Sequence, residues 1–400
     1  MAVLASRSRD IAAAEDCVAE AYRLAFEKWP VIGLPDNPEG WLMTVARNKM
    51  TDRQKSHFNR TSTSLHDIQD GLENGGAMEI AVPANQETDT VPDERLKLMF
   101  ACAHPAIDET IRAPLIMQTV LGLEAADIAR LFLVPTATMA QRLVRAKTKI
   151  RDAGIPFSIP DRTLWPERLE AVLEAIYGAY SAGLDDVAEV TEDRGVEALF
   201  LADLLAVLLP EEAEALGLAA LICFSASRAD AKLDAKGHFV PLDAQNPALW
   251  NSHFIARGAL CLSRAETLRS IGRFQLEAAI QSVHSDRRRS GITNWQAIAR
   301  LYEGLVALYP TSGVMVARAY AVSKVAGAKA GLKALAQIPA DILAEFQPAQ
   351  ACLAALLAEI GDVAGAVAAY VKAISLSQDE QTRNYLRSLL DALPRPRSVA

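Results

Sequence analysis

Apolar residues recur along most of this chain with the period of an α-helix. The clearest case lies in residues 136–151, where Met139, Leu143, Ala146 and Ile150 fall on one face at helical spacing. Alanine and leucine dominate the composition, and alternating runs of β-branched residues are nearly absent. The pattern therefore predicts an all-α protein.

Residues 122–151 have the pattern of a helix-turn-helix. A short amphipathic helix over 123–131 precedes a tight connection, in which Pro135 cannot donate into a continuing helix. Thr136 is expected to cap the second helix. The polar face of that helix contains Thr138, Gln141, Arg142, Arg145 and Lys149. Six Lys and Arg residues and no acid lie between positions 128 and 151, so this face suits DNA phosphates and base edges. A solvated helix of an ordinary helical hairpin is the alternative.

Residues 10–57 predict a first helical module. One helix is expected to begin at Asp10 and to end near Pro30, with acids early and a base late. Asn37, Pro38 and an early carboxylate then indicate the start of a second helix that runs to position 57. Its polar face aligns Thr44, Arg47, Asn48, Thr51 and Lys55. This face is also compatible with DNA, although Asp52 interrupts its positive charge.

Composition divides the chain into five segments. Two helical modules at 1–57 and 93–155 are joined by a linker at 58–92, which is rich in Asn, Gly, Ser, Thr and Pro. Positions 65–94 hold eight acidic residues and no Lys or Arg. This composition indicates a solvated tether. The alternative is an acidic segment that mimics nucleic acid and occupies the surface where nucleic acid would bind. A helical extension at 156–275 is followed by repeats at 276–395.

The extension is rich in alanine and leucine, with its clearest helices expected at 166–180, 196–209, 212–226 and 247–272. Near the C-terminus small residues recur after 34 positions. The recurring set is Gly327, Ala330, Gly331 and Ala334, then Gly361, Ala364, Gly365 and Ala368. This period favours tetratricopeptide-like helical repeats over coincidence in an alanine-rich chain.

Charge and chemistry narrow the function classes. The net charge of −8 confines any DNA contact to local patches. Five scattered cysteines predict reduced thiols in a cytoplasmic protein. Cys102 is expected to be buried and His104 to lie in a loop, rather than both binding a metal ion.

No apolar run is long enough to span a membrane, and no signal peptide is present. Catalytic and cofactor-binding motifs are missing, so neither an enzyme nor a cofactor is expected. The basic run at 287–289 is expected to be a solvated loop.

Taken together, these segments resemble an extracytoplasmic-function sigma factor of bacterial RNA polymerase. AAAEDCVAEAY resembles the polymerase-binding helix of sigma region 2, and LPDNPEGWLMTVARNKMTDRQK resembles its promoter-melting loop and following helix. DERLKLMFACAHPAI and LEAADIARLFLVPTATMAQRLVRAKTKI resemble sigma region 4. The continuation resembles the subgroup with a C-terminal tetratricopeptide-type extension, so the resemblance covers nearly the whole chain.

The resemblance implies residue roles. Core RNA polymerase would be contacted by Asp16, Glu20, Tyr22 and Arg23. The loop with Asp36 and Asn37 would capture a flipped base of the −10 element, at a cost of a few kcal/mol that pocket contacts offset. The −10 strand would be held by Thr44, Arg47, Asn48, Thr51 and Lys55. The −35 element would be contacted by Thr136, Thr138, Gln141, Arg142 and Arg145, with Lys149 on the same face. The expected partners are core polymerase, promoter DNA and a segment of this chain or another protein bound by the repeats.

This chain departs from the family pattern at several positions. Ala19 stands where the family usually has Gln, and Ala137, Ala140 and Gln141 stand where Gly, Lys and Ser are common. YSAGL at 180–184 replaces a sequence closer to FNEGY, and most of the first region 2 helix is missing before Asp10. Three alternatives remain: a helix-turn-helix regulator that does not bind polymerase, a repeat scaffold with a decayed N-terminal half, and an unrecognised helical enzyme.

Overall fold

A computed structural model describes residues 1–61, 91–132, 134–158, 160, 162–185, 191–235, 237–377 and 380–394. Within those residues all regular elements are helical apart from one isolated β-bridge, which confirms the predicted all-α fold. Most of the predicted acidic linker, residues 62–90, lies outside the described residues. No described helix is both long and apolar enough to cross a membrane.

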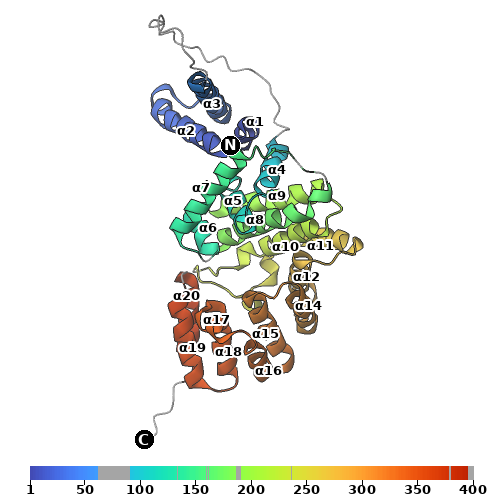
Figure 1. The fold of residues 1–400 in the computed structure, drawn as a ribbon. Helices are drawn as coiled ribbons and strands as arrows, with labels where there is room; N and C mark the ends of the chain where they lie inside the picture. The colour runs from blue at the N-terminus through green and yellow to red at the C-terminus, as the bar shows by residue number, and fades with distance from the viewer. Residues whose placement is uncertain are drawn as a thin grey trace, which may run out of the picture. The chain divides into compact units, whose positions relative to one another are not determined.

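The chain divides into two compact units, residues 1–182 and 183–400. The helices of the first unit are α1 (Ala2–Ser8), α2 (Ile11–Ile32), α3 (Pro38–Thr61), α4 (Val91–Cys102), α5 (Glu109–Thr119), α6 (Ala125–Leu131), α7 (Thr136–Asp152) and most of α8 (Pro166–Asp185) (Figure 1). Helices α2 and α3 pack as a hairpin, and α1 packs against both α2 and α4. Asp10 caps α2, as expected, and the helix ends at Ile32, two residues after Pro30 and close to the predicted end.

Helix α8 begins in the sequence predicted as the extension and packs within the first unit. Trp165, just before α8, stacks on Phe100 of α4 with ring centroids 6.3 Å apart. Arg168, buried at 6% exposure, donates to the Phe100 carbonyl at 3.4 Å, and Arg112 of α5 donates to the Glu167 carbonyl at 3.3 Å. A fragment that keeps the first unit whole therefore has to include α8.

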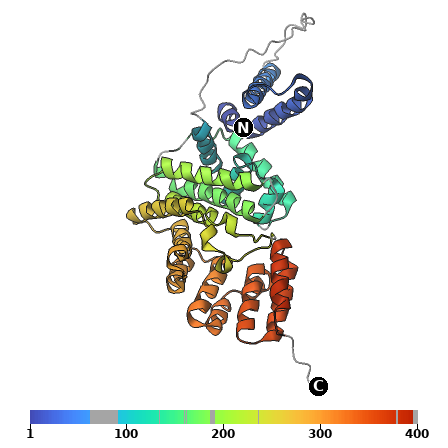
Figure 2. The same ribbon diagram turned by 180° about the vertical axis from the view of Figure 1, so that it is seen from behind.

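The second unit consists mainly of successive helical hairpins (Figure 2). Its α-helices are α9 (Thr191–Leu208), α10 (Ala213–Ala226), α11 (Ser252–Thr267), α12 (Arg273–Ser285), α13 (Arg287–Ser290), α14 (Trp295–Leu308), α15 (Ser312–Ala326), α16 (Ala328–Leu335), α17 (Ala340–Glu345), α18 (Gln347–Glu359), α19 (Val363–Leu376) and α20 (Glu380–Asp391). The predicted helix at 247–272 is wrong at both ends: Asn251 caps α11 with its side chain, and α11 ends at Thr267. A short 3-10 turn, Pro247–Leu249, precedes the cap.

The 34-residue echo coincides with two helical hairpins, α15/α16 and α18/α19. Gly327 and Gly361 occupy the same place in each turn, with φ of 86° and 83°, a conformation that favours glycine. Gly331 permits the close approach of α15, because a Cβ there would lie 2.6 Å from the Ser323 Cβ. In the first hairpin Gly331 and Ala334 are buried, whereas in the second Ala364 and Ala368 are exposed, so the recurring small residues lie at the helix contact in the first hairpin only.

Candidate nucleic-acid interface

Helices α6 and α7 are joined by a short connection. The Phe132 amide donates to the Ile128 carbonyl at 3.1 Å, and the Val134 amide donates to the Ala129 carbonyl at 3.0 Å. Pro135 is extended and occupies the N-cap position of α7, without any side-chain cap. The expectation that Thr136 caps this helix is wrong, because Thr136 is already its first helical residue.

Helix α7 is amphipathic as predicted. Met139, Leu143, Ala146 and Ile150 are at most 5% exposed and form its buried face. On the predicted polar face, Thr138 is half-buried, and the exposed residues are Thr136, Gln141, Arg142, Arg145 and Lys149. The structure therefore leaves the cationic side of α7 accessible to solvent.

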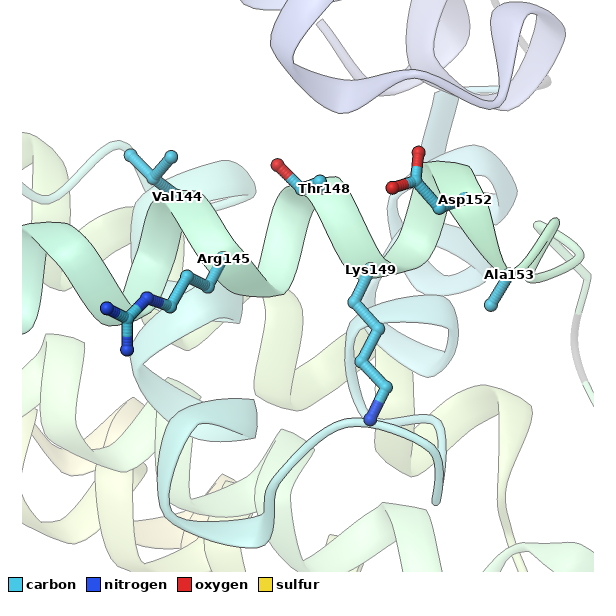
Figure 3. Close-up of a pocket in the computed structure, with 6 residues that line it drawn as sticks. All are labelled: Val144, Arg145, Thr148, Lys149, Asp152 and Ala153. Atoms are coloured by element: carbon cyan, nitrogen blue, oxygen red, sulfur yellow. The ribbon is translucent and has the colours of Figure 1, made fainter.

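Two cations of α7 point the same way. Arg145 and Lys149 project to one side of the helix, whereas Thr148 and Asp152 project to the other (Figure 3). Arg145 and Lys149, together with Arg142, also line a hollow of about 270 Å³ against the start of α5. This arrangement offers three positive groups to one anion or to neighbouring phosphates.

One carboxylate lies beside these cations. Asp108 caps α5, accepting from the Thr110 amide at 2.9 Å and from its hydroxyl. Those hydrogen bonds, and then the positive charges of Arg142 and Arg112, hold the pKa of Asp108 below its usual range. Asp108 therefore remains ionised near neutral pH, and its charge opposes an anion placed deep in the hollow rather than on the outer face of α7.

Helix α3 begins as predicted, but its DNA-compatible face is less open than that of α7. Asn37 Oδ1 accepts from the Gly40 amide at 2.8 Å, which confirms the predicted cap. The Thr44 hydroxyl donates to the Gly40 carbonyl at 2.8 Å, and the Thr51 hydroxyl donates to the Arg47 carbonyl at 3.0 Å. Both hydroxyls are therefore engaged with the helix backbone.

The remaining predicted residues of this region differ in exposure. Asp36 and Asn48 are exposed, whereas Arg47 is half-buried. Burial, followed by the charge of Arg7, lowers the pKa of Arg47. The side chain of Lys55 lies outside the described residues. The structure thus brings Thr44, Arg47, Asn48 and Thr51 onto α3 without making them one exposed patch.

The predicted polymerase-binding residues lie on α2, where Asp16, Glu20 and Arg23 form ion pairs and Tyr22 is half exposed. Asp16 Oδ2 lies 2.7 Å from Arg53 Nη1 of α3, and Glu20 Oε1 lies 3.6 Å from Lys49 Nζ of α3. Glu20 also accepts from Arg23 at 2.7 Å, and this bond is the main reason why the pKa of Glu20 falls to about 2. Asp16 and Glu20 follow the first turn of α2, so they do not cap it.

Of the apolar surface at the end of α2, only Tyr22 was identified from the sequence. Several large apolar side chains are at least half exposed over the last turns of α2 and the loop that follows: Tyr22, Phe26, Val31, Ile32 and Leu34. We call these five residues the α2 apolar end. The i, i+4 spacing of Tyr22 and Phe26 was the available signal, but spacing alone does not distinguish an exposed face from a buried one. Exposed apolar clusters of this kind mark protein-binding surfaces.

A salt bridge joins the two predicted modules. Lys147 Nζ of α7 lies 2.6 and 2.7 Å from the two carboxylate oxygens of Glu15 on α2. The side chain of Lys147 is 11% exposed and that of Glu15 is 34% exposed. The first helical hairpin and the helix-turn-helix are therefore packed together, by residues 132 positions apart.

No cluster of three or more metal-binding side chains occurs among the described residues. Cys102 is fully buried, and burial raises the pKa of its thiol to about 12. Its neighbour His104 accepts a hydrogen bond from the Ala106 amide at 3.1 Å. This geometry agrees with a buried cysteine beside a loop histidine.

Comparison with known proteins adds relatives of unknown function. Residues 168–266 match a family of unknown function, DUF6596. An uncharacterized protein of Rhizobium meliloti (strain 1021) is 33% identical over 404 residues, covering 100% of this chain and 95% of the relative. No solved structure matches this chain.

Proposed function

This chain belongs to the same family as the uncharacterized Rhizobium meliloti protein, and we propose that it is a bacterial sigma factor. In this proposal it recruits core RNA polymerase to specific promoters and supports initiation. The single observation that carries the proposal is α7: its apolar face is buried while its cationic face is open. That geometry suits a recognition helix in a major groove.

The DNA-contacting residues of α7 fall into two groups. Arg145 and Lys149 project to one side from later turns of the helix (Figure 3), and in this proposal they contact phosphates. Gln141 and Arg142 lie nearer its N-terminal end, the end that reads base edges in helix-turn-helix proteins. Loss of a phosphate contact weakens every promoter alike, whereas loss of a base contact weakens some promoters selectively.

The polymerase-binding surface in this proposal combines charge and apolar area. The Asp16–Arg53 pair is more than half exposed on both sides, so it can exchange partners at little cost, and the Glu20–Lys49 pair is partly exposed. The α2 apolar end adds a desolvatable surface on the same helix. A protein partner that covers both would gain more than either feature provides alone.

In this proposal the two modules separate from each other on a promoter. Elements at −10 and −35 lie about 25 base pairs apart, or about 85 Å along DNA at about 3.4 Å per base pair. A compact body of 182 residues has a radius of gyration of about 16 Å. Helices α3 and α7 cannot reach both elements while Glu15 and Lys147 hold them in one body.

Charge reversal tests the polymerase contact. Reversing Asp16 and Glu20 to Lys is expected to abolish co-purification with core polymerase while the helical circular-dichroism signal is kept. The control reverses Glu303 and Asp341, two exposed acids of the second unit. Unchanged binding of the Asp16/Glu20 variant to core polymerase would contradict this assignment.

A helix-turn-helix regulator without polymerase binding is the second candidate. It is favoured by one observation: Asp16 and Glu20 already have partners within the hairpin, whereas Arg142, Arg145 and Lys149 of α7 are exposed to solvent. Such a regulator binds duplex DNA tightly without polymerase. The sigma factor proposed here requires core polymerase for tight promoter binding, so a binding assay with and without core distinguishes the two.

We also assign a regulatory role to the helical repeats of the second unit. The appropriate test compares full-length protein with a fragment ending after α8, because α8 packs with α4 and α5. A difference in core affinity or in transcript yield at matched concentration supports control within the chain. Equal activity of the two proteins, unchanged when the second unit is added back, would rule it out.

A further inference from the structure

Helix α9 is apolar on all sides over its second half. Between Gly195 and Leu209 the only charged residues are Glu197 and Asp203. The helix packs against α10, and its inner face is at most 2% exposed at four positions: Ala198, Leu201, Ala202 and Leu205. A helix that is apolar all round is normally buried on every side. Within the described part of the chain, however, the outer face of α9 is left uncovered.

The uncovered face is a stripe of large apolar side chains. Val196 is 67% exposed, Phe200 47%, Val207 73% and Leu208 40%. We define the α9 stripe as these four residues and the four that lie between or beside them on the same face: Gly195, Leu199, Asp203 and Leu204. The stripe is about 20 Å long, at about 1.5 Å per residue. An exposed apolar patch of this kind marks a protein-binding surface.

The spacing of the α9 stripe fits another helix. Val196, Phe200, Asp203 and Val207 follow one another at intervals of four, three and four residues. Apolar positions that repeat every 3.5 residues on average form the seam along which two helices pair. The spacing therefore favours a helix as the partner.

The charged residue of the seam is already paired and favours one orientation. Arg257 Nη2 of α11 lies 2.6 Å from Asp203 Oδ2, and the Asp203 side chain is 17% exposed. Covering Asp203 further therefore does not bury an unpaired charge. Two copies of α9 in parallel would place their Asp203 carboxylates opposite each other, whereas antiparallel copies place each Asp203 opposite Phe200. Like-charge repulsion therefore favours the antiparallel pair.

The α9 stripe is matched to itself in the antiparallel orientation. Its residues form four pairs, each centred between positions 201 and 202: Val196 with Val207, Leu199 with Leu204, Phe200 with Asp203, and Gly195 with Leu208. A Cβ on Gly195 would meet no atom within 4 Å, so Leu208 of a second copy has space above this glycine. Two-fold symmetric interfaces require this kind of self-complementarity.

We propose that the α9 stripe is the interface of a reversible homodimer, in which two copies of α9 pair antiparallel across a two-fold axis. A strip about 20 Å long and about 10 Å wide is smaller than the about 800 Å² per partner of a stable interface. The dimer is therefore weak, with a dissociation constant of about 1–100 µM. This inference is independent of the proposed sigma function, because the α9 stripe contains none of the predicted DNA-binding or polymerase-binding residues.

Sedimentation equilibrium of the full-length protein tests the dimer. We expect the native chain to shift from monomer to dimer between about 1 and about 200 µM. V196E/V207E places charges at the two most exposed positions of the α9 stripe and is expected to weaken dimerisation at least about tenfold. The control, V325E/V371E, adds the same charges at exposed positions of α15 and α19 and is expected to dimerise as the native chain does. A native chain that stays monomeric, or equal dimerisation of V196E/V207E, would overturn the proposal.

Disulfide cross-linking tests the orientation without adding charge. The five native cysteines are buried, so single variants V196C and V207C each present one accessible thiol. In the antiparallel pair position 196 of one copy lies beside position 207 of the other, whereas the two copies of position 196 lie about 16 Å apart. A mixture of V196C and V207C is therefore expected to form at least about tenfold more linked dimer than either variant alone, because a disulfide requires Cα atoms within about 7 Å. Preferential linking of each variant to itself, or no linked dimer in the mixture, would overturn the antiparallel pair.

Discussion

Replacing Glu15 with Gln removes the charge that faces Lys147 between the two halves of the first unit. Exposed ion pairs contribute about 0–1 kcal/mol to the stability of the folded state. Removing one partner of a buried ion pair lowers that stability by about 3–5 kcal/mol. With side-chain exposures of 34% and 11%, this pair falls between those limits. Two short bonds to one ammonium group, at 2.6 and 2.7 Å, support a cost of about 2 kcal/mol.

Hydrogen exchange measures this cost locally, without requiring the whole chain to unfold in one step. A change of about 2 kcal/mol corresponds to about 30-fold faster exchange in the second half of α7 and the start of α2. Asp152→Asn is the control, because the Arg151–Asp152 pair at the end of α7 is at least half exposed on both sides. This control is expected to change the exchange rate by less than about threefold.

A charge swap completes the test. Glu15→Lys and Lys147→Glu each place like charges together and should open the contact, whereas the double variant restores opposite charges and most of the protection. Additive losses in the double variant, or no change in Glu15→Gln, would refute the claim that this pair holds the two modules together.

Three further predictions concern local stability. Burial lowers the pKa of His284 to about 4, so its stabilising contribution is complete above about pH 6.5 and falls by about 3 kcal/mol between pH 6.5 and 4. About 2 kcal/mol of this loss falls between pH 7 and pH 5, where denaturant unfolding measures it, and a His284→Gln variant with the same pH dependence would contradict it. Asn37→Ala removes the side-chain cap of α3 and should lower the local stability of that helix by about 1 kcal/mol. Faster amide hydrogen exchange in the first turn of α3 measures this loss, and an unchanged exchange rate would contradict the prediction. Gly331→Ala should lower the stability to thermal unfolding by about 1–3 kcal/mol because the added Cβ would crowd α15. Gly313→Ala is the control, because a Cβ there meets no atom within 4 Å and should not lower the stability. Equal effects of the two substitutions would contradict the packing argument.

Local features could be predicted from the sequence because they depend on nearby residues. The buried face of α7 follows from helical spacing, and the start of α3 follows from Asn37 and the proline after it. Gly327 and Gly361 marked equivalent turns because glycine adopts positive φ more readily than any other residue. Each of these signals is contained in a few consecutive turns.

Features that depend on distant residues could not be predicted. Nothing near Glu15 indicates that its partner is Lys147. The expectation of a solvated basic loop at 287–289 is wrong for Arg287, because its guanidinium donates to the carbonyls of Leu242 and Asp243, which lie more than 40 positions away. Arg47 lies on the polar face by spacing, yet packing beside α1 half-buries it. The candidate site was therefore predicted as positions on helices, while its accessibility required the tertiary structure.

Run-off transcription tests the sigma-factor proposal most directly. Full-length protein and core polymerase are combined on the promoter region upstream of the chain's own operon. We expect one defined transcript that requires both components, is lost with Arg142→Ala/Arg145→Ala, and survives in Lys329→Ala/Lys333→Ala, which removes two exposed cations of the second unit. No defined transcript with core polymerase, or transcription unaffected by the loss of Arg142 and Arg145, would contradict the proposal.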